Sequence, residues 1–427
     1  MTIAIGVGIL VLLIALGVPV GFALGLSSIT ALSMIAPFAT TLSLMTSVVH
    51  QTTANNVLMT IPMFVMMAEF LTVGGVAEDM LLACNRLLRK VRGGMAMACI
   101  LGGVIHAAAT GSSSASAASL ARASYPAMMK AGYASSFAVG TVAIAGTLAA
   151  MIPPSIPFIL FGLVTGASVG KLFIAGLIPA LLTALGYILT ISLTLWIKPS
   201  LGPSSAKLEE AAANTQDRGN VWPMALLITV VIGGLYSGVA TPSEISTVGA
   251  LGALIISFFT RRMTAPAFIR AVGGTLRIVT MIMVILFGAQ MFGYFVSYSK
   301  VTDVLLHWIA ISGFSHSLVV VVMVFTYLVL GAFLDQGSII ILTAPISTAL
   351  MVGLGYSPIW WGVVIIKTAE IGFVHPPLGI ITFVVSAATK TDLKQNYIGV
   401  IPYIVTELLL LTLLVSWPDL SLWLVRM

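Results

Sequence analysis

Four short segments of this sequence place polar residues or prolines inside long apolar surroundings, and they are where chemistry could occur. The first is the small-residue run Thr110–Ser119, and the second is the polar break Gly331–Ser338 around Asp335. The third and fourth, Gly146–Pro154 and Glu370–Pro377, each end in two consecutive prolines. Hydroxyl and carbonyl oxygens are the ligands that a partly dehydrated cation needs. These segments are therefore candidate cation sites.

Each candidate also has a purely structural explanation. Small residues let helix backbones approach one another, and Asp335 suits the N-cap of the helix that follows it. Two consecutive prolines can simply kink a helix. They also remove hydrogen-bond donors and free the carbonyls one turn earlier, so we expect both helices to unwind there. The matched positions of these segments in the two halves of the chain favour a functional role.

The composition places these segments in a membrane. Hydrophobic residues make up 59% of the 427 residues and charged residues only 7%, which is more apolar surface than a soluble protein can cover. Runs such as 172–196 and 401–415 carry almost no charge and could cross about 30 Å of hydrocarbon as α-helices. The first apolar run, 3–16, lacks a basic leader and a cleavage site, so we expect a retained helix.

Charge and cysteine content exclude other classes of partner. The net charge of +6 is spread over short loops, so it indicates membrane orientation rather than binding to nucleic acid. Cys84 and Cys99 have no metal-type spacing. We therefore expect neither a structural disulfide nor a cysteine-bound metal.

The sequence also predicts an internal repeat. Four features recur in the same order, at offsets of 221, 225, 226 and 223 residues. The pairs are Gly17 with Gly238, Val76 with Val301, Gly111 with Gly337, and Pro153 with Pro376. Duplicated halves are common among secondary transporters.

Each half has the same predicted order of three crossings, an amphipathic arm, a segment with a polar middle, a broken helix and a last crossing. In the first half these are 3–16, 20–36, 54–73, 76–92, 95–125, 133–165 and 171–197. In the second half they are 221–237, 243–259, 277–298, 300–313, 316–352, 357–388 and 397–415. If the polar-centred segments enter and return on one side, each half crosses five times and the second half is inverted. The predicted fold class is an all-α polytopic membrane protein with about ten transmembrane helices and two re-entrant hairpins.

The basic residues predict the orientation, because Lys and Arg accumulate on the cytoplasmic side. With the arm that carries Arg86 and Lys90 placed inside, fifteen Lys and Arg residues fall inside. Only Lys171, Lys300 and Arg426 fall outside. Both termini are then expected on the outer side.

Four segments of the sequence resemble the large membrane subunit of the tripartite ATP-independent periplasmic (TRAP) transporters. They are Gly111–Ala118, Gly146–Pro157, Phe333–Gln336 and Glu370–Pro377, and the similarity covers nearly the whole chain. The resemblance implies a sodium-driven importer of a small organic anion, such as a sialic acid or a C4-dicarboxylate, in the bacterial inner membrane. It also implies a small membrane subunit and a periplasmic binding protein as partners, two or more sodium ions, and no organic cofactor.

The resemblance further implies an elevator mechanism of the ion-transporter superfamily, in which a transport part slides against a scaffold. The scaffold helices and arms are assigned to 1–92 and 221–313, the hairpins and broken helices to 93–197 and 314–427, and a cytoplasmic linker to 198–220. The family usually has glycine where Ala149 stands, and often Thr and Asn where His375 and Ile381 stand. The second cation site is therefore expected to depend more on backbone carbonyls.

The candidate site residues lie in the four matched segments. For a first sodium site they are Ser112, Ser113, Ser114, Gly146, Thr147 and Pro153. For a second sodium site they are Asp335, Gly337, Gly372, His375 and Pro376. For the substrate they are Ser114, Ser116, Pro154, Ser155, Ser338 and Pro377.

Other polar residues and other functions are given less weight. Lys367 and Glu370 form an i, i+3 pair for which a structural role is expected, and Glu407 is expected near a helix end, where its charge can reach water. One alternative function is an intramembrane serine protease that uses Ser112 and His106. Another is a stand-alone cation-coupled symporter or exchanger with the same fold.

Overall fold

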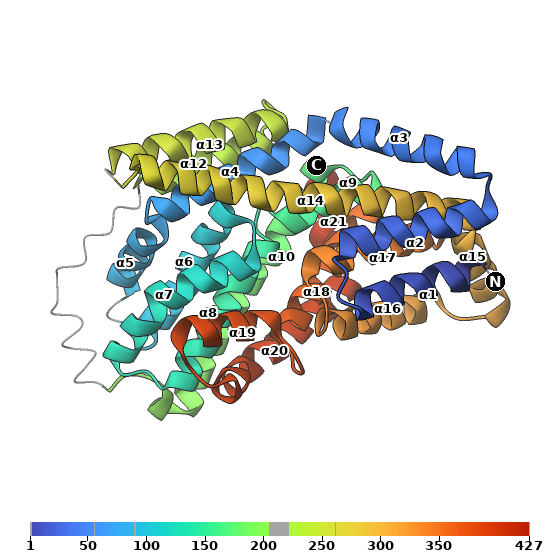
Figure 1. Ribbon diagram of the computed structural model, residues 1–427. Helices are drawn as coiled ribbons and strands as arrows, with labels where there is room; N and C mark the ends of the chain where they lie inside the picture. Colours follow the sequence, from blue (N-terminus) through green and yellow to red (C-terminus); the bar gives the residue numbers. More distant parts are fainter. Residues whose placement is uncertain (1, 55, 89–90, 205–221, 261, 427) are drawn as a thin grey trace.

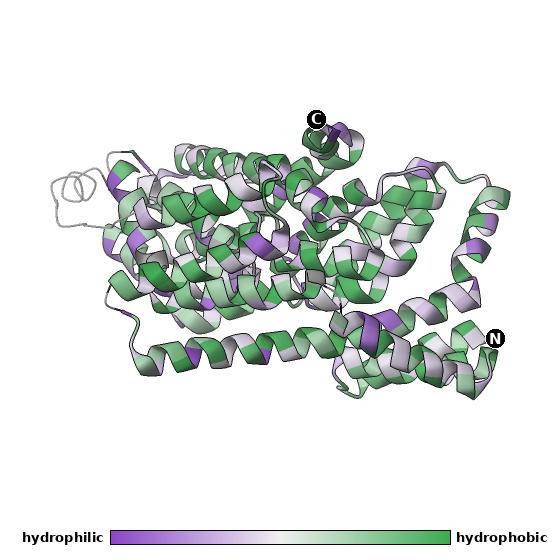
Figure 2. Cartoon of the chain, turned by 90° about the horizontal axis from the view of Figure 1, so that it is seen from above, coloured by the Kyte–Doolittle hydropathy of each residue, from purple (hydrophilic) through white to green (hydrophobic). Residues whose placement is uncertain are grey.

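The chain is helical throughout the residues that the computed structural model describes, which are 2–54, 56–88, 91–204, 222–260 and 262–426 (Figure 1). The predicted linker 198–220 lies mostly outside the described residues, and so does Lys90 of the first arm. Seen from above, apolar residues dominate nearly every helix (Figure 2), which agrees with the predicted membrane environment.

The first half consists of ten α-helices and three short 3-10 helices in its described part. They are α1 (Thr2–Ala15), α2 (Val20–Ile35), α3 (Phe38–Ala54), η1 (Asn56–Met59), α4 (Thr60–Val73), α5 (Val76–Leu88), α6 (Gly94–Thr110), α7 (Ser113–Ala131), α8 (Ser135–Thr147), η2 (Leu148–Ala150), α9 (Ile156–Thr165), α10 (Val169–Ile197) and η3 (Pro199–Leu201). The second half repeats this order. Its helices are α12 (Trp222–Tyr236), α13 (Pro242–Phe259), α14 (Ala265–Ser299), α15 (Val301–Ser312), α16 (His316–Gly331), α17 (Gln336–Gly353), α18 (Pro358–Val374), α19 (Ile380–Thr389), α20 (Leu393–Ser416) and α21 (Asp419–Arg426).

The two halves interlock through matched contacts. Helix α2 packs on α14, and its counterpart α13 packs on α4. In the same way, α8 packs on α20 and its counterpart α18 packs on α10. Helix α9 packs on α17 as α19 packs on α7. Each of these pairs takes one helix from each half, so the repeat that the sequence predicted is present in the packing as well as in the order of elements.

Two helices were not predicted, and one predicted boundary is wrong. Helix α3 was missed because its Thr and Ser residues give a weak apolar signal, although it packs on α2 and α14. Helix α14 begins at Ala265, well before the predicted start at 277, because Thr264 caps it. The amphipathic helix α21 was also missed, and it packs on α10 and α18.

Among the described residues, five helices are long and apolar enough to cross a membrane alone: α10, α13, α14, α17 and α20. Several shorter apolar helices follow one another closely, as α8 and α9 do, so two of them together can match the length of one crossing. Helix α14 has 35 residues and is about 52 Å long at 1.5 Å per residue. It lies along the length of the molecule, while α5 and α15 lie at its opposite ends (Figure 1).

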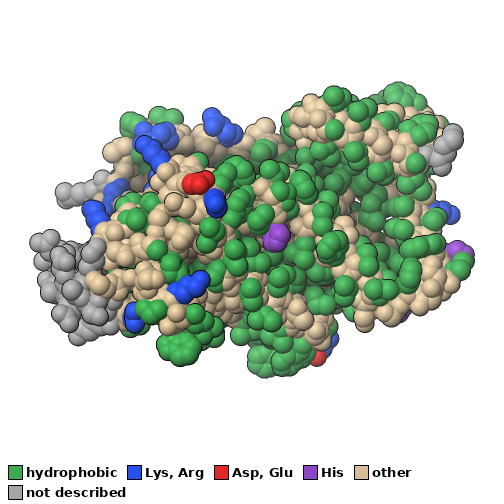
Figure 3. All heavy atoms as spheres, turned by 90° about the horizontal axis from the view of Figure 1, so that it is seen from below, with side chains coloured by type: hydrophobic (Ala, Val, Ile, Leu, Met, Phe, Trp, Pro, Cys, Tyr) green, Lys and Arg blue, Asp and Glu red, His purple; other side chains and the backbone are tan. Residues whose placement is uncertain are grey.

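Charged side chains are unevenly placed on the surface. On the face seen in Figure 3, Lys and Arg gather toward the left end, the end where Figure 1 places α5, and apolar side chains cover the middle. A band of apolar surface with basic residues at one end is the distribution expected of a chain that spans a membrane.

Arg262, in the loop before α14, binds the residues at the start of the first arm, which is α5. Its Nη1 donates to the carbonyls of Gly74 and Gly75, both at 3.0 Å, and its Nη2 lies 3.3 Å from Asp79 Oδ1. We expect Arg262→Ala to lower the free energy of unfolding by about 1 kcal/mol, because the carbonyls at the end of α4 lose a charged donor. Thermal melting of the purified protein in detergent measures this. The exposed Arg270→Ala on α14 is the control, and equal melting shifts in both variants would contradict the assignment.

Candidate functional site

The turn between α6 and α7 rests directly on the break between α8 and α9. Gly111 has a positive φ of 58°, and a Cβ there would lie 2.7 Å from the Pro154 carbonyl oxygen. The Ile156 amide donates to the Gly111 carbonyl at 3.1 Å. The Ser113 hydroxyl donates to the Thr147 carbonyl at 3.3 Å. The hairpin formed by α6 and α7, called hairpin 1, therefore contacts both sides of the break.

This first break is an unwound segment, as the two prolines predicted. Regular α-helix ends at Thr147, η2 covers 148–150, and the next helix begins at Ile156. Residues 148–155 are all buried, and the Pro153–Pro154 bond is cis. Ser155 caps α9, with the Phe158 amide donating to its hydroxyl at 3.4 Å.

Gly146 allows hairpin 1 to approach α8 closely. A Cβ at Gly146 would lie 2.5 Å from the Cβ of Ala117 on α7. Beside Ala117, Ser116 is buried, and its hydroxyl has no hydrogen-bond partner among the described residues. Hydroxyl and carbonyl oxygens of hairpin 1 and of the first break therefore meet in one buried place.

The second hairpin, hairpin 2, consists of α16 and α17, and Asp335 forms the N-cap of α17. Asp335 Oδ2 accepts from the Ser338 amide at 2.9 Å, and its Oδ1 accepts from the Ser338 hydroxyl. A Cβ at Gly337 would lie 3.5 Å from Leu160 on α9. The structural explanation for Asp335 is thus correct, while its side chain remains exposed and able to accept further bonds.

The second break lies between α18 and α19. It is exposed, whereas the first break is buried. His375, Pro376 and Pro377 are exposed, and the Pro376–Pro377 bond is cis. The Tyr397 hydroxyl donates to the carbonyls of Pro377 and Leu378, at 3.1 and 2.9 Å. This break therefore contacts α20 through Tyr397.

A hydrogen bond joins members of the first set of candidates, whereas the second hairpin and the second break meet through packing at Gly372. Gly372 is buried against Gly331 of α16, where a Cβ would lie 2.5 Å from the Gly331 Cα. Within the described ranges, no hydrogen bond joins Asp335 to His375 or Pro376. The substrate candidates are also divided between the two hairpins, because Ser338 caps α17 beside Asp335 whereas Ser116 and Ser155 lie at the first break.

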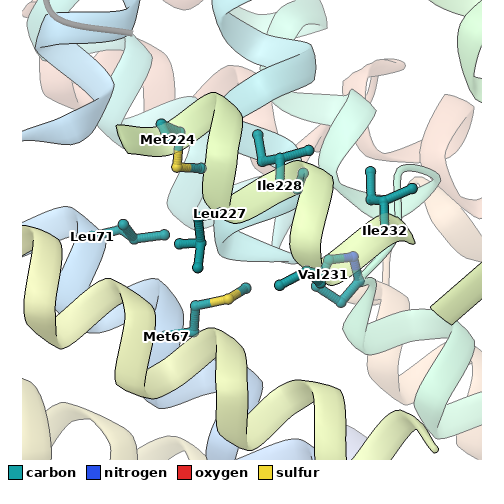
Figure 4. A pocket seen from close by; sticks show the side chains of 9 residues that line it. Met67, Leu71, Met224, Leu227, Ile228, Val231 and Ile232 are labelled. Carbon is teal, nitrogen blue, oxygen red and sulfur yellow. The ribbon is translucent and has the colours of Figure 1, made fainter. Parts of the chain in front are cut away.

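Hairpin 1 and the first break pack on two neighbouring helices, α4 and α12, around a small apolar void. Pro154 and Ala108 line it on one side. The rest of the lining comes from α4 and α12, with Leu227 and Val231 of α12 pointing toward Met67 and Leu71 of α4 (Figure 4). These lining residues are Met67, Leu71, Met224, Leu227, Ile228, Val231 and Ile232. The contact between this part of the chain and the neighbouring helices therefore depends on apolar packing rather than on hydrogen bonds.

A buried ionic cluster lies next to the first break, and the sequence interpretation missed most of it. Lys367 Nζ lies 2.5 Å from Glu407 Oε2 and 3.7 Å from Glu370 Oε2, and it donates to the Thr183 hydroxyl at 3.1 Å. The predicted pair of Lys367 and Glu370 is confirmed. The prediction that Glu407 lies near a helix end is wrong, because Glu407 lies in the middle of α20 and is only 1% exposed.

Two hydroxyls connect this cluster to the first break. The Tyr187 hydroxyl on α10 donates to Glu407 Oε1, and it lies 3.3 Å from the Thr147 hydroxyl. The signal that could have found the cluster is a charged residue in the middle of an apolar run, which is costly unless it is paired. Both Lys367 and Glu407 meet that description.

Comparisons with known proteins agree with these features. The family model described as "Tripartite ATP-independent periplasmic transporter, DctM component" matches residues 7–420. The C4-dicarboxylate TRAP transporter large permease protein DctM of Pseudomonas aeruginosa is 31% identical over 376 residues, which cover 87% of each chain. The protein of the same name from Rhodobacter capsulatus is 30% identical over 436 residues, covering 97% of each chain. The YdaH transporter of Alcanivorax borkumensis has a similar fold, with a TM-score of 0.62, 16% identity and 88% of each chain covered.

Proposed function

Because this chain belongs to the family of DctM components of tripartite ATP-independent periplasmic (TRAP) transporters, we propose that it imports a small carboxylate by coupling it to sodium. Family membership confirms the predicted resemblance. It makes the chain a multi-pass permease subunit of the inner membrane and a transporter rather than an enzyme, so the serine protease alternative is wrong.

The contact between hairpin 1 and the first break is the observation that carries the sodium proposal. Carbonyls freed by an unwound helix are suited to coordinate sodium in transporters. Here the Thr147 carbonyl and the Ser113 hydroxyl lie 3.3 Å apart. Ser112, Ser114 and Gly146 adjoin them in the sequence, and Pro153 belongs to the same break. We assign the first sodium to this place.

The second sodium and the substrate are assigned to residues that the structure leaves partly open. Asp335, Gly337, Gly372, His375 and Pro376 would hold a second sodium once hairpin 2 closes over the second break. The carboxylate would bind between the two hairpins. Its ligands would be the hydroxyls of Ser114, Ser116, Ser155 and Ser338 together with the two prolines that precede α9 and α19, Pro154 and Pro377, because a helix N-terminus attracts an anion.

The proposed topology has ten crossings, two re-entrant hairpins and both termini in the periplasm. The transport part comprises 93–197 and 314–427, and the scaffold comprises 1–92 and 221–313. The placement of α5 and α15 at opposite ends of the molecule supports arms on opposite membrane surfaces (Figure 1). The apolar contact of hairpin 1 and Pro154 with α4 and α12 supports sliding of one part against the other, because few directional bonds would have to break there.

The proposed partners are a small membrane subunit and a periplasmic binding protein that delivers the substrate. A C4-dicarboxylate is the first substrate to test, because the two relatives described above carry that substrate in their names. Vesicles that hold the two membrane subunits should take up the substrate only when loaded binding protein is present outside. Equal uptake of free substrate without the binding protein would support the stand-alone symporter instead.

Substitutions at Asp335 distinguish its role as the N-cap of α17 from a role in cation binding. Asn is as good an N-cap as Asp, so Asp335→Asn keeps the cap and removes the charge, whereas Asp335→Ala removes both. We expect both variants to need about tenfold more sodium for half-maximal uptake, which corresponds to about 1.4 kcal/mol. Only the Ala variant should also melt earlier. Wild-type sodium dependence in the Asn variant would make Asp335 a helix cap alone.

A further inference from the structure

A cavity of about 830 Å³ lies between α14 and α15 on one side and the ends of α9, α17 and α18 on the other. Helices α14 and α15 belong to the proposed scaffold, whereas α9, α17 and α18 belong to the proposed transport part. Among the described residues that line the cavity, none is assigned above to sodium or to the carboxylate. The cavity is therefore separate from those sites, and its lining needs an explanation of its own.

Several polar side chains of this lining have no partner within the chain. Gln290, Tyr294 and Ser297 follow one another at helical spacing along α14, so they lie on one side of it. Within the described ranges, their side chains make no hydrogen bond. Thr348 of α17 is 6% exposed, and its hydroxyl also lacks a partner there. Because polar groups withdrawn from water are normally hydrogen-bonded, this lining is suited to bind a polar group that the chain itself does not supply.

Two charged side chains line the cavity at the junction of α14 and α15. Lys300 has a positive φ of 52° and forms the N-cap of α15, and Asp303 lies in the first turn of that helix. Both are exposed, and in the part of the chain that the structure describes neither takes part in an ion pair. A positive and a negative group one turn apart complement a zwitterion. A dicarboxylate fits less well, because Asp303 repels it.

Apolar side chains form much of the remaining wall. Val164 comes from α9, Leu306 from α15 and Val352 from α17, and Val352 is 50% exposed. In the proposed topology α15 lies along the outer membrane surface, so the cavity lies at the boundary between lipid head groups and hydrocarbon. A small water-soluble ligand would leave these apolar side chains uncovered. The lining therefore fits a ligand with a zwitterionic head and an apolar tail.

We propose that this cavity binds a zwitterionic aminophospholipid, such as phosphatidylethanolamine, between the scaffold and the transport part. The lipid phosphate accepts from the Lys300 ammonium, and the lipid ammonium donates to Asp303. The acyl chains cover the apolar walls. Phosphatidylglycerol has the same phosphate but no ammonium, so Asp303 favours the zwitterionic lipid over it. The depth of the cavity in the membrane rests on the proposed topology.

The first test compares the two lipids on the purified full-length chain. Native mass spectrometry in detergent measures how much phosphatidylethanolamine and phosphatidylglycerol, with identical acyl chains and at equal concentration, remain bound. We expect about fivefold more of the former, which is the upper end of the effect of one exposed ion pair. Equal binding of the two lipids by the wild type would overturn the proposal, and this result needs no variant.

Substitutions of the two charged residues test how the head group is recognised. Asp303→Asn should abolish the preference for phosphatidylethanolamine, whereas Lys300→Gln should lower the binding of both lipids, because both carry the phosphate. Lys171 is also exposed but does not line the cavity, so Lys171→Gln is the control and should behave as the wild type. An unchanged preference in Asp303→Asn would contradict the assigned head-group contacts.

A substitution that fills the cavity tests where the lipid lies. Gly293 lines the cavity, and a Cβ there would meet nothing within 4 Å, so Gly293→Leu places a side chain in the space of the acyl chains. Gly273→Leu on the same helix is the matched control, because a Cβ at Gly273 also meets nothing within 4 Å and Gly273 does not line the cavity. Gly293→Leu should lose most of the bound phosphatidylethanolamine, and Gly273→Leu should keep it. Equal retention in both variants would place the lipid elsewhere and overturn the site.

Water-soluble phosphoethanolamine distinguishes a lipid from a small zwitterionic solute. Phosphatidylethanolamine should raise the melting temperature of the wild type, and phosphoethanolamine at the same head-group concentration should not. Equal stabilisation by phosphoethanolamine would make the occupant a soluble zwitterion and contradict the lipid assignment. These measurements need neither sodium nor transport, so they can fail while the proposed function holds, and they can succeed while it fails.

Discussion

Replacing Gly111 with alanine is expected to reduce sodium-driven uptake at least about tenfold. Gly111 has a positive φ of 58°, which costs a residue with a Cβ about 1 kcal/mol. The new Cβ would also lie 2.7 Å from the Pro154 carbonyl oxygen, so hairpin 1 must move off the first break. Initial uptake rates and the sodium concentration for half-maximal rate measure the effect.

Gly166→Ala is the matched control for this variant. Gly166 also ends a helix with a positive φ, 75°, but a Cβ there would meet nothing within 4 Å. It carries the conformational cost without the collision with the break. Similar losses of uptake in Gly111→Ala and Gly166→Ala would show that backbone strain, and not the contact of hairpin 1 with the break, limits transport.

Replacing Gly399 with alanine is expected to have the largest effect on stability, about 3 kcal/mol. Helices α8 and α20 cross at Gly140 and Gly399, and a Cβ at Gly399 would lie 1.9 Å from the Ser136 carbonyl oxygen. Overpacking of this kind costs about 1–3 kcal/mol and sometimes more, and here the obstacle is helix backbone that cannot rotate away. The yield of monodisperse protein and its melting temperature measure the loss.

Gly293→Ala on α14 is the corresponding control. This glycine is also inside a helix, but a Cβ there would meet nothing within 4 Å. Alanine should then raise stability by about 0.5–1 kcal/mol, because it restricts the unfolded chain. If Gly399→Ala had the same melting temperature as Gly293→Ala, the close crossing of α8 and α20 would be contradicted.

Features that interrupt an apolar pattern could be predicted from the sequence. The double prolines at 153 and 376 break their helices, and Gly111 and Asp335 mark the hairpin turns, because backbone chemistry acts locally. Helix α3 was missed because its Thr and Ser residues resemble a polar loop when no partner is known. In the structure it is a regular helix that packs on α2 and α14.

The segments that form the candidate site could be predicted from the sequence, but the contacts among them could be predicted only in part. Hairpin 1 and the first break were expected to meet, and they do. The second hairpin and the second break were expected to meet in the same way, but they meet through Gly331 and Gly372, while Asp335 caps its own helix. The cluster around Lys367 could not be found from spacing, because Glu407 and Tyr187 reach it from two other helices.

Uptake with and without sodium is the most direct test of the proposed mechanism. Vesicles would hold this chain and its small membrane subunit, with loaded binding protein outside and either a sodium gradient or the same concentration of choline. We expect accumulation of the carboxylate above its external concentration with sodium, and none with choline. Equal accumulation in both conditions would contradict the claim that the oxygens of hairpin 1 and the first break form the sodium site that drives import.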